Sequence, residues 1–116
     1  MDCIRNTVLL TAIAVSLMMA SPAFAADAGR GKTLFTSTYG CFQCHGTVGQ
    51  GGNAGPKLAP DPMPFEALSN FVRTTNRQMP PYREAVLPNE DLADIYAYLQ
   101  SVPAVPDYKK IPLLND

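Results

Sequence analysis

The chain has 116 residues, 47% of them hydrophobic, and a formal net charge of −1 from nine basic and ten acidic side chains. This length fits one small domain. The near-neutral balance has no basic stripe and no long run of one sign, which excludes a charge-driven nucleic-acid-binding surface.

The N-terminal segment has the pattern of a targeting signal. An apolar run over residues 7–20 follows Arg5, and Ala23 and Ala25 form a small-x-small cleavage pattern. The run is shorter than the roughly 20 residues that span a bilayer. We therefore predict a signal peptide over residues 1–25, a periplasmic protein and no stable membrane anchor after cleavage. An uncleaved anchor is the alternative.

Residues 27–38 are predicted to form the first helix of the mature chain. Asp27 can cap this helix, and Leu34 and Phe35 supply apolar contacts. Gly31 costs about 1 kcal/mol of helix stability relative to Ala. A glycine at this point is consistent with a second helix that crosses closely. The alternative is a loosely ordered start, because short helices are marginal alone.

The segment from Cys41 to His45 is the attachment signature of a c-type haem, Cys-x-x-Cys-His. Each thiol adds to one vinyl group of the porphyrin, and the histidine then reaches the iron. Residues three and four apart lie on one face of a helical turn, so Cys41, Cys44 and His45 can address the same flat cofactor. Two cysteines in an exported chain would otherwise suggest a disulfide. We predict one covalent haem c, with His45 as an iron ligand.

The glycine-rich loop over residues 46–55 is predicted to wrap the haem edge, where backbone passes close to the ring. It lacks the Gly-Lys-Ser/Thr ending of a nucleotide-binding P-loop, and no strand precedes it. Beyond the loop, the carbonyl of Pro56 is a candidate acceptor for the second ring N–H of His45. Leu58 is a candidate to pack on the haem face. An ordinary turn is the alternative for this segment.

A second helix is predicted over residues 64–76, with a proline near its first position. Arg73 and Arg77 lie at its end, where cations suit the helix dipole. One or both could also meet a haem propionate. Four apolar side chains at helical spacing predict a core-facing stripe: Phe65, Leu68, Phe71 and Val72.

Met79 is the predicted second iron ligand. The two prolines after it make the backbone stiff and extended, which can aim one side chain. A thioether is a soft, neutral haem ligand. His45 is the only histidine, so ligation by two histidines of one chain is excluded. Met63 is the other candidate, and either methionine could instead be core filler.

The last helix is predicted over residues 88–102, with acidic side chains in its first turn and Pro103 after its end. We expect its apolar face to cross the first helix at Gly31 and Phe35. Packing on the second helix is the alternative. Residues 104–116 are predicted to form an extended, proline-containing tail, apolar enough to lie along the domain or along a partner subunit. The apolar face consists of Leu92, Ile95, Tyr98, Leu99 and Val102.

Over about residues 28–102 the chain resembles the class I cytochrome c family. The matching features occur in the family's order: Gly31 and Phe35, Cys41 to His45, Gly55-Pro56-Lys57-Leu58, Met79-Pro80, and Tyr98-Leu99. The resemblance implies an all-α fold in which three main helices of a domain over residues 26–103 pack around one covalent haem. It also implies iron ligation by His45 and Met79, and orientation of His45 by Pro56.

The resemblance further implies one-electron transfer by an exported protein that is not itself an enzyme. Because the lysine ring of the mitochondrial type is missing, the chain looks more like short bacterial periplasmic cytochromes. Its expected partners are a donor dehydrogenase and a downstream cytochrome or oxidase. The alternative is a dedicated electron-accepting cytochrome subunit of a periplasmic dehydrogenase complex.

Three other functions fit the residues less well. A Cys-x-x-Cys thiol-disulfide oxidoreductase would normally carry a βαβ pattern, and no strand is predicted. Two cysteines and one histidine give three ligands, which is short of a closed zinc site. A peroxidase needs an open distal position on the iron, which Met79 would block.

Overall fold

The computed structural model of the chain describes residues 25–114, so the predicted signal peptide lies outside the described residues except for Ala25. Helices and loops make up this range, and none of its residues forms a β-strand. The arrangement is compatible with the predicted all-α class. Across these same residues, no helix is both long and apolar enough to cross a membrane.

The first helix is built in two parts. The α-helix α2 (Ala28–Thr33) continues directly into the π-helical segment η1 (Leu34–Thr38). The carboxylate of Asp27 accepts hydrogen bonds from the N–H groups of Gly29 and Arg30 at 2.8 and 3.0 Å, so the predicted cap is confirmed. The π-helical second half was not predicted. It leads the chain directly into the segment that begins at Cys41.

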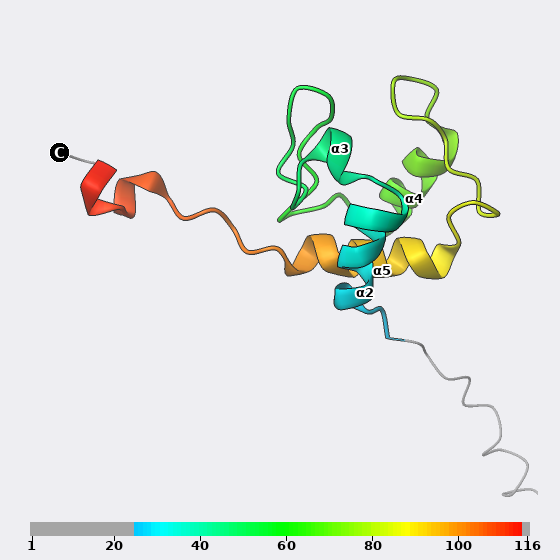
Figure 1. Cartoon of the computed structure of the whole chain (residues 1–116), viewed down its shortest axis with the longest axis horizontal. Coiled ribbons are helices and arrows are strands. Elements are labelled where there is room, and N and C mark those ends of the chain that lie inside the picture. Colours follow the sequence, from blue (N-terminus) through cyan, green and yellow to red (C-terminus); the bar gives the residue numbers. More distant parts are fainter. Residues whose placement is uncertain (1–24, 115–116) are drawn as a thin grey trace, which may run out of the picture.

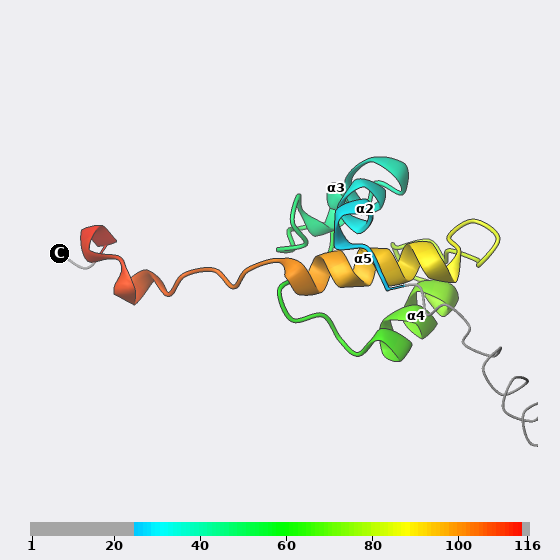
Figure 2. The same ribbon diagram turned by 90° about the horizontal axis from the view of Figure 1, so that it is seen from below.

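Helix α2 crosses helix α5 (Asn89–Ser101) at Gly31, and the two helices lie side by side in both views (Figures 1 and 2). A Cβ atom added to Gly31 would lie 1.9 Å from the carbonyl oxygen of Asp94. Phe35 is fully buried one turn later, and its ring lies 5.6 Å from that of Tyr98. The predicted crossing is therefore confirmed, and only a glycine allows the two backbones to approach this closely.

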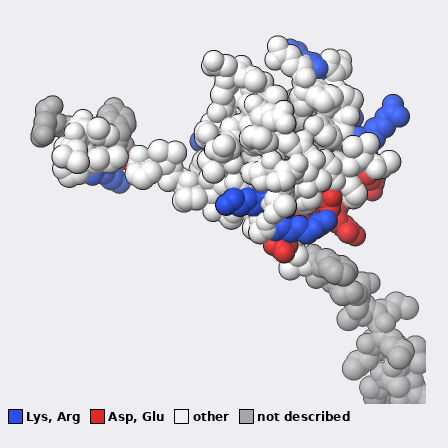
Figure 3. Space-filling view, viewed as in Figure 1, with Lys and Arg blue, Asp and Glu red and all other residues white. Residues whose placement is uncertain are grey.

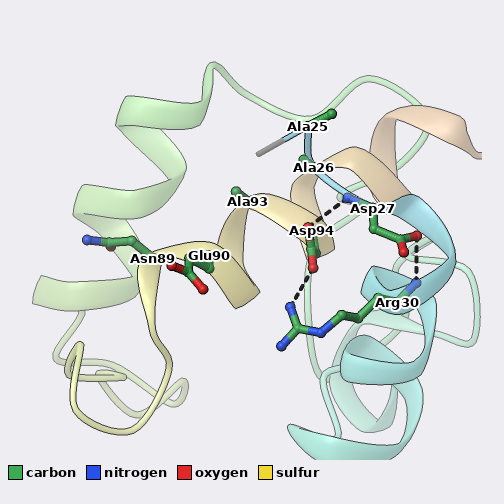
Figure 4. Close-up of a pocket in the computed structure, with 8 residues that line it drawn as sticks. All are labelled: Ala25, Ala26, Asp27, Arg30, Asn89, Glu90, Ala93 and Asp94. Atoms are coloured by element: carbon green, nitrogen blue, oxygen red, sulfur yellow. Dashed lines mark hydrogen bonds and ion pairs between the residues drawn. The ribbon is translucent and has the colours of Figure 1, made fainter. Parts of the chain in front are cut away.

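A polar cluster joins α2 to α5 beside this crossing, and Figure 4 shows three of its members, Asp27, Arg30 and Asp94. The carboxylate of Asp94 accepts from the backbone N–H of Asp27 at 2.7 Å and from the guanidinium of Arg30. The same guanidinium donates to Asp91, which also accepts from the hydroxyl of Tyr39 at 2.6 Å. In the space-filling view, basic and acidic atoms therefore lie together where α2 meets α5 (Figure 3).

The cluster shifts two acid-base equilibria. Burial, followed by the hydrogen bond to Asp91, raises the pKa of Tyr39 to about 12. The hydrogen bond from Tyr39, followed by the one from Arg30, lowers the pKa of Asp91 below its ordinary value. Both shifts favour a neutral Tyr39 hydroxyl beside an ionised Asp91.

Helix α4 (Phe65–Thr74) begins directly after Pro64 and packs on the opposite side of α5 from α2 (Figure 2). Leu68 and Val72 are buried, and the Phe65 ring lies 5.3 Å from that of Tyr96. Phe71 is 47% exposed, so the prediction of a uniformly core-facing stripe is wrong at this residue.

The core lies around α5, whose predicted apolar face is buried except for the half-buried Val102. The tail leaves the end of α5 and runs away from the domain (Figures 1 and 2). It contains two short 3₁₀ turns that were not predicted, η2 (Tyr108–Lys110) and η3 (Pro112–Leu114). The buried core side chains are Leu34, Phe35, Ala59, Leu68, Val72, Leu87, Leu92, Ile95, Tyr98 and Leu99.

Candidate functional site

One large cavity of about 720 Å³ opens between the segment that follows Cys41, helix α4 and helix α5. Its volume lies in the range of roughly 300–1,000 Å³ that is usual for ligand sites. Apolar side chains form most of its lining, among them Phe35 from η1, Leu68 from α4 and Ile95 from α5. The structure brings all six sequence-predicted site residues to this cavity: Cys41, Cys44, His45, Pro56, Leu58 and Met79.

The two thiols and the imidazole come from one helical turn. Helix α3 (Phe42–His45) starts at Cys41, whose carbonyl accepts from the backbone N–H groups of Cys44 and His45 at 3.3 and 3.1 Å. Cys41 is half-buried and Cys44 is exposed. Because of this burial, the pKa of the Cys41 thiol is raised to about 11.

The imidazole of His45 is oriented by a hydrogen bond to the backbone. Its Nδ1 lies 2.8 Å from the carbonyl oxygen of Pro56, as the sequence predicted. A carbonyl only accepts hydrogen bonds, so Nδ1 carries the proton, and in the neutral imidazole the lone pair is then on Nε2. The histidine is 8% exposed and lines the cavity. This tautomer is the one that a metal-ligating histidine needs.

The backbone of the glycine-rich loop lies close to the ring of His45. A Cβ atom on Gly55 would lie 2.9 Å from Nδ1 of His45. Gly51, with φ of +87°, donates from its N–H to the carbonyl of His45 at 2.7 Å. The loop therefore packs against the back of His45, and Gly51 and Gly55 allow that close approach.

Met79 lines the cavity from a separate segment, the Met79 loop, which we define as residues 75–88 between α4 and α5. Its side chain is partly buried and packs against the core. Met63 also lines the cavity but is 45% exposed. The structure thus brings both methionines to the site, and the lower exposure of Met79 favours it as the ligand. Ligation itself stays a prediction.

The donor set fits a covalently attached iron porphyrin. Two thiols lie one turn apart at the edge of an apolar cavity, beside an imidazole whose Nε2 is free to bind a metal. The thioether of Met79 also lines the cavity. A closed zinc site would need a fourth ligand, and the described residues contain no cluster of three or more histidine, cysteine or carboxylate groups able to hold a metal ion.

The two arginines of the second predicted helix have different surroundings. Arg77 lines the cavity, so it stays a candidate to meet a haem propionate. Arg73 is not among the lining residues, and its guanidinium donates instead to the carbonyl of Tyr82 and to Asn89. The sequence pattern placed both at a helix end and could not separate them.

Sequence reasoning missed several lining residues. Phe71 was assigned to the core, although its position at the edge of the apolar stripe could have indicated a site-facing residue. Tyr82 had no predicted role, yet it lines the cavity and meets the ring of Tyr39 edge-on at 6.4 Å. No sequence signal pairs Tyr39 with Tyr82, because the contact joins distant segments.

Comparison with known proteins identifies one family. The family model described as cytochrome c oxidase, cbb3-type, subunit III matches residues 26–99. No curated protein and no solved structure matches the chain. The matched stretch contains every predicted site residue and ends within α5, before the tail.

Proposed function

The chain belongs to the cbb3-type cytochrome c oxidase subunit III family, a class I c-type cytochrome family, and from this membership we propose that it is a periplasmic one-electron carrier. The family binds covalent haem c with iron, which implies haem-based electron transfer rather than catalysis. In our proposal Cys41 and Cys44 attach the haem, and His45 and Met79 ligate its iron. The helices α2 with η1, α4 and α5 surround it.

One observation carries this proposal. The hydrogen bond from His45 Nδ1 to the Pro56 carbonyl leaves Nε2 available in a cavity that both attachment cysteines also line. The haem supplies a ferric/ferrous couple when bound. The chain's own contribution is to hold His45 and Met79 in fixed positions, which limits rearrangement between the two oxidation states. The apolar lining keeps water away from the iron.

The partners in this proposal are a donor dehydrogenase and a downstream cytochrome or oxidase. They would dock at the exposed edge of the haem through a small, transient interface. Export and cleavage after Ala25 are part of the same proposal. N-terminal sequencing of protein from a periplasmic extract should begin at Ala26, and recovery of the intact N-terminus in membranes would contradict it.

The tail supports a second candidate, a dedicated electron-accepting subunit of a periplasmic dehydrogenase complex. Val105 and Leu113 are 82% and 87% exposed on a segment that leaves the domain. An exposed apolar segment of this kind suits a lasting contact with a larger protein. Stable co-purification with a dehydrogenase that is lost on deletion of residues 104–116 would favour this candidate over the free carrier.

The thiol-disulfide alternative has less support. A reactive cysteine needs a lowered pKa, whereas the pKa of Cys41 is raised to about 11 by burial. The described residues also contain no strand that could form the βαβ unit usual for such enzymes.

The decisive test is spectroscopic. Purified mature protein should keep its haem colour through acid–acetone extraction, and its ferric form should show the weak band near the red end that Met–iron ligation produces. Met79→Ala should abolish that band, and Met63→Ala, the matched control, should leave it. Loss of colour on extraction would overturn covalent attachment, and loss of the band in Met63→Ala alone would overturn the choice of Met79.

A further inference from the structure

We propose that Arg73 is a positioning residue that holds the Met79 loop against the iron. This inference rests on the proposed function, because it concerns how the distal ligand is kept in place. It assigns to Arg73 a role different from that of a propionate partner.

The Met79 loop is tied to helix α4 at Tyr82. The backbone N–H of Tyr82 donates to the carbonyl of Val72 at 2.9 Å. One guanidinium nitrogen of Arg73 donates to the Tyr82 carbonyl at 2.8 Å. Both backbone polar groups of Tyr82 are therefore bonded to the last turns of α4.

The same guanidinium extends the tie to helix α5. Its second terminal nitrogen donates to Oδ1 of Asn89, the first residue of α5, at 2.9 Å. The side-chain amide of Asn89 in turn donates to Glu84 within the loop at 2.8 Å. One side chain thus joins the middle of the loop to the helices at both of its ends.

Rigid backbone links this tie to the ligand. Only Pro80 and Pro81 separate Tyr82 from Met79, and each proline has a fixed φ. If Tyr82 is displaced, the backbone of Met79 should therefore move with it, because the two prolines between them bend little. The Tyr82 ring also contacts Tyr39, so the tie and the ring contact oppose movement of the loop from two directions.

The chemistry requires an arginine. A planar guanidinium presents donors in a fixed fork and can bond two acceptors at once with a defined spacing. A lysine ammonium keeps the charge but has no such fork. Because Arg73 does not line the cavity, its loss should act through Met79 rather than through direct contact with the haem.

The experiment measures how easily an external ligand displaces Met79. Imidazole is titrated into the ferric holoprotein of wild type, Arg73→Gln and Arg73→Lys. Opening of the loop should become easier in Arg73→Gln, which binds imidazole about 10-fold more tightly, the effect of losing roughly one charge-assisted hydrogen bond. Arg73→Lys should lie between wild type and Arg73→Gln.

Arg83→Gln is the matched control. Arg83 lies in the same loop, is exposed, and makes hydrogen bonds there only through its backbone carbonyl. This variant should bind imidazole as wild type does. Equal imidazole affinity in Arg73→Gln and Arg83→Gln would overturn the inference. Asn89→Ala removes one of the two acceptors of the Arg73 guanidinium and should give a smaller increase in imidazole affinity. This variant keeps the test usable if Arg73→Gln does not fold.

A second readout separates this inference from the proposed ligation. Hydrogen exchange of the Tyr82 amide reports the tie whether or not Met79 binds iron. Faster exchange in Arg73→Gln but not in Arg83→Gln supports the tie, and equal exchange contradicts it. If wild type lacks the red-end band, the ligation by Met79 fails, and Arg73 is then judged by the exchange measurement.

Discussion

Two segments that line the cavity are held in place by different means: residues 41–58, here called the His45 wall, and the Met79 loop, here called the Met79 wall. On the His45 wall, the hydrogen bonds that fix His45 run within residues 41–58, to the carbonyl of Pro56 and from the N–H of Gly51. On the Met79 wall, the hydrogen bonds run from the loop to α4 and α5, and the ring of Tyr82 also contacts that of Tyr39. His45 is thus positioned by nearby sequence, and Met79 by tertiary packing.

This difference has a consequence for stability. A local turn can form its bonds with little loss of chain entropy, because the loop it closes is short. The Met79 loop keeps its place only while the helices around it are packed. We therefore expect perturbation of the helix packing to release Met79 before it releases His45.

The largest effect is expected when the two cysteines that attach the haem in our proposal are replaced. The double variant Cys41→Ser, Cys44→Ser should retain no covalent haem, because these are the only cysteines outside the predicted signal peptide. Acid–acetone extraction should move all colour from the protein into the solvent. Colour that stays with the precipitated protein would contradict the assignment of both thiols.

Gly31→Ala should force α2 away from α5, because Gly31 is where the two helices cross. The added methyl would meet the Asp94 carbonyl at 1.9 Å, so the helices must move apart. Overpacking of this kind costs about 3 kcal/mol or more in the free energy of unfolding. Denaturant unfolding of the holoprotein measures this loss of stability.

Gly29→Ala is the control for this variant. Its methyl would meet no backbone atom of another element, only the capping carboxylate of Asp27 at 3.2 Å, which needs a shift of a few tenths of an ångström. Stability should therefore change little. If both variants unfold at the same denaturant concentration, the crossing is not as close as the structure has it.

Gly55→Ala should perturb the His45 wall alone. The new methyl would lie 2.9 Å from His45 Nδ1, which forces the ring or the loop to shift and costs about 1–3 kcal/mol. The reduction potential should change as well, because the bond from His45 to Pro56 is disturbed. Gly52→Ala, whose methyl would come no closer than 3.8 Å to Cys44, should leave both quantities near wild type. A potential unchanged in Gly55→Ala would contradict this account.

Tyr39→Phe should have the smallest effect and a distinctive pH dependence. It removes one hydrogen bond to Asp91, worth about 1 kcal/mol. The raised pKa of Tyr39 means that its contribution is complete below pH 10 and is lost between about 10 and 12. The lowered pKa of Asp91 means that its contribution is present above about pH 3.8 and is lost as pH falls further.

The difference in unfolding free energy between wild type and Tyr39→Phe should therefore be greatest at intermediate pH. It should shrink at both ends of a series from pH 3 to pH 12. A difference that stays constant over this range would show that the variant acts through packing of the ring rather than through the bond to Asp91.

Much of the fold could be predicted because its signals are local. The Asp27 cap, the proline before α4 and the acidic start of α5 each act within one turn, and the structure confirms these helices to within a few residues. Gly31 predicted a crossing because a glycine in mid-helix otherwise only costs stability. The π-helical η1 was missed, since its bonds depend on how the chain turns toward Cys41.

The sequence by itself determined the His45 side of the site. Cys41, Cys44 and His45 lie within one turn, and the acceptor for His45 follows eleven residues later, so short-range geometry alone brings these groups together. The tertiary structure decided which groups secure the Met79 wall. The sequence could not separate Arg73 from Arg77, or pair Tyr39 with Tyr82, because each partner lies across a loop or on another helix. Such contacts form only after the helices have packed, and a pattern along the chain carries no record of them.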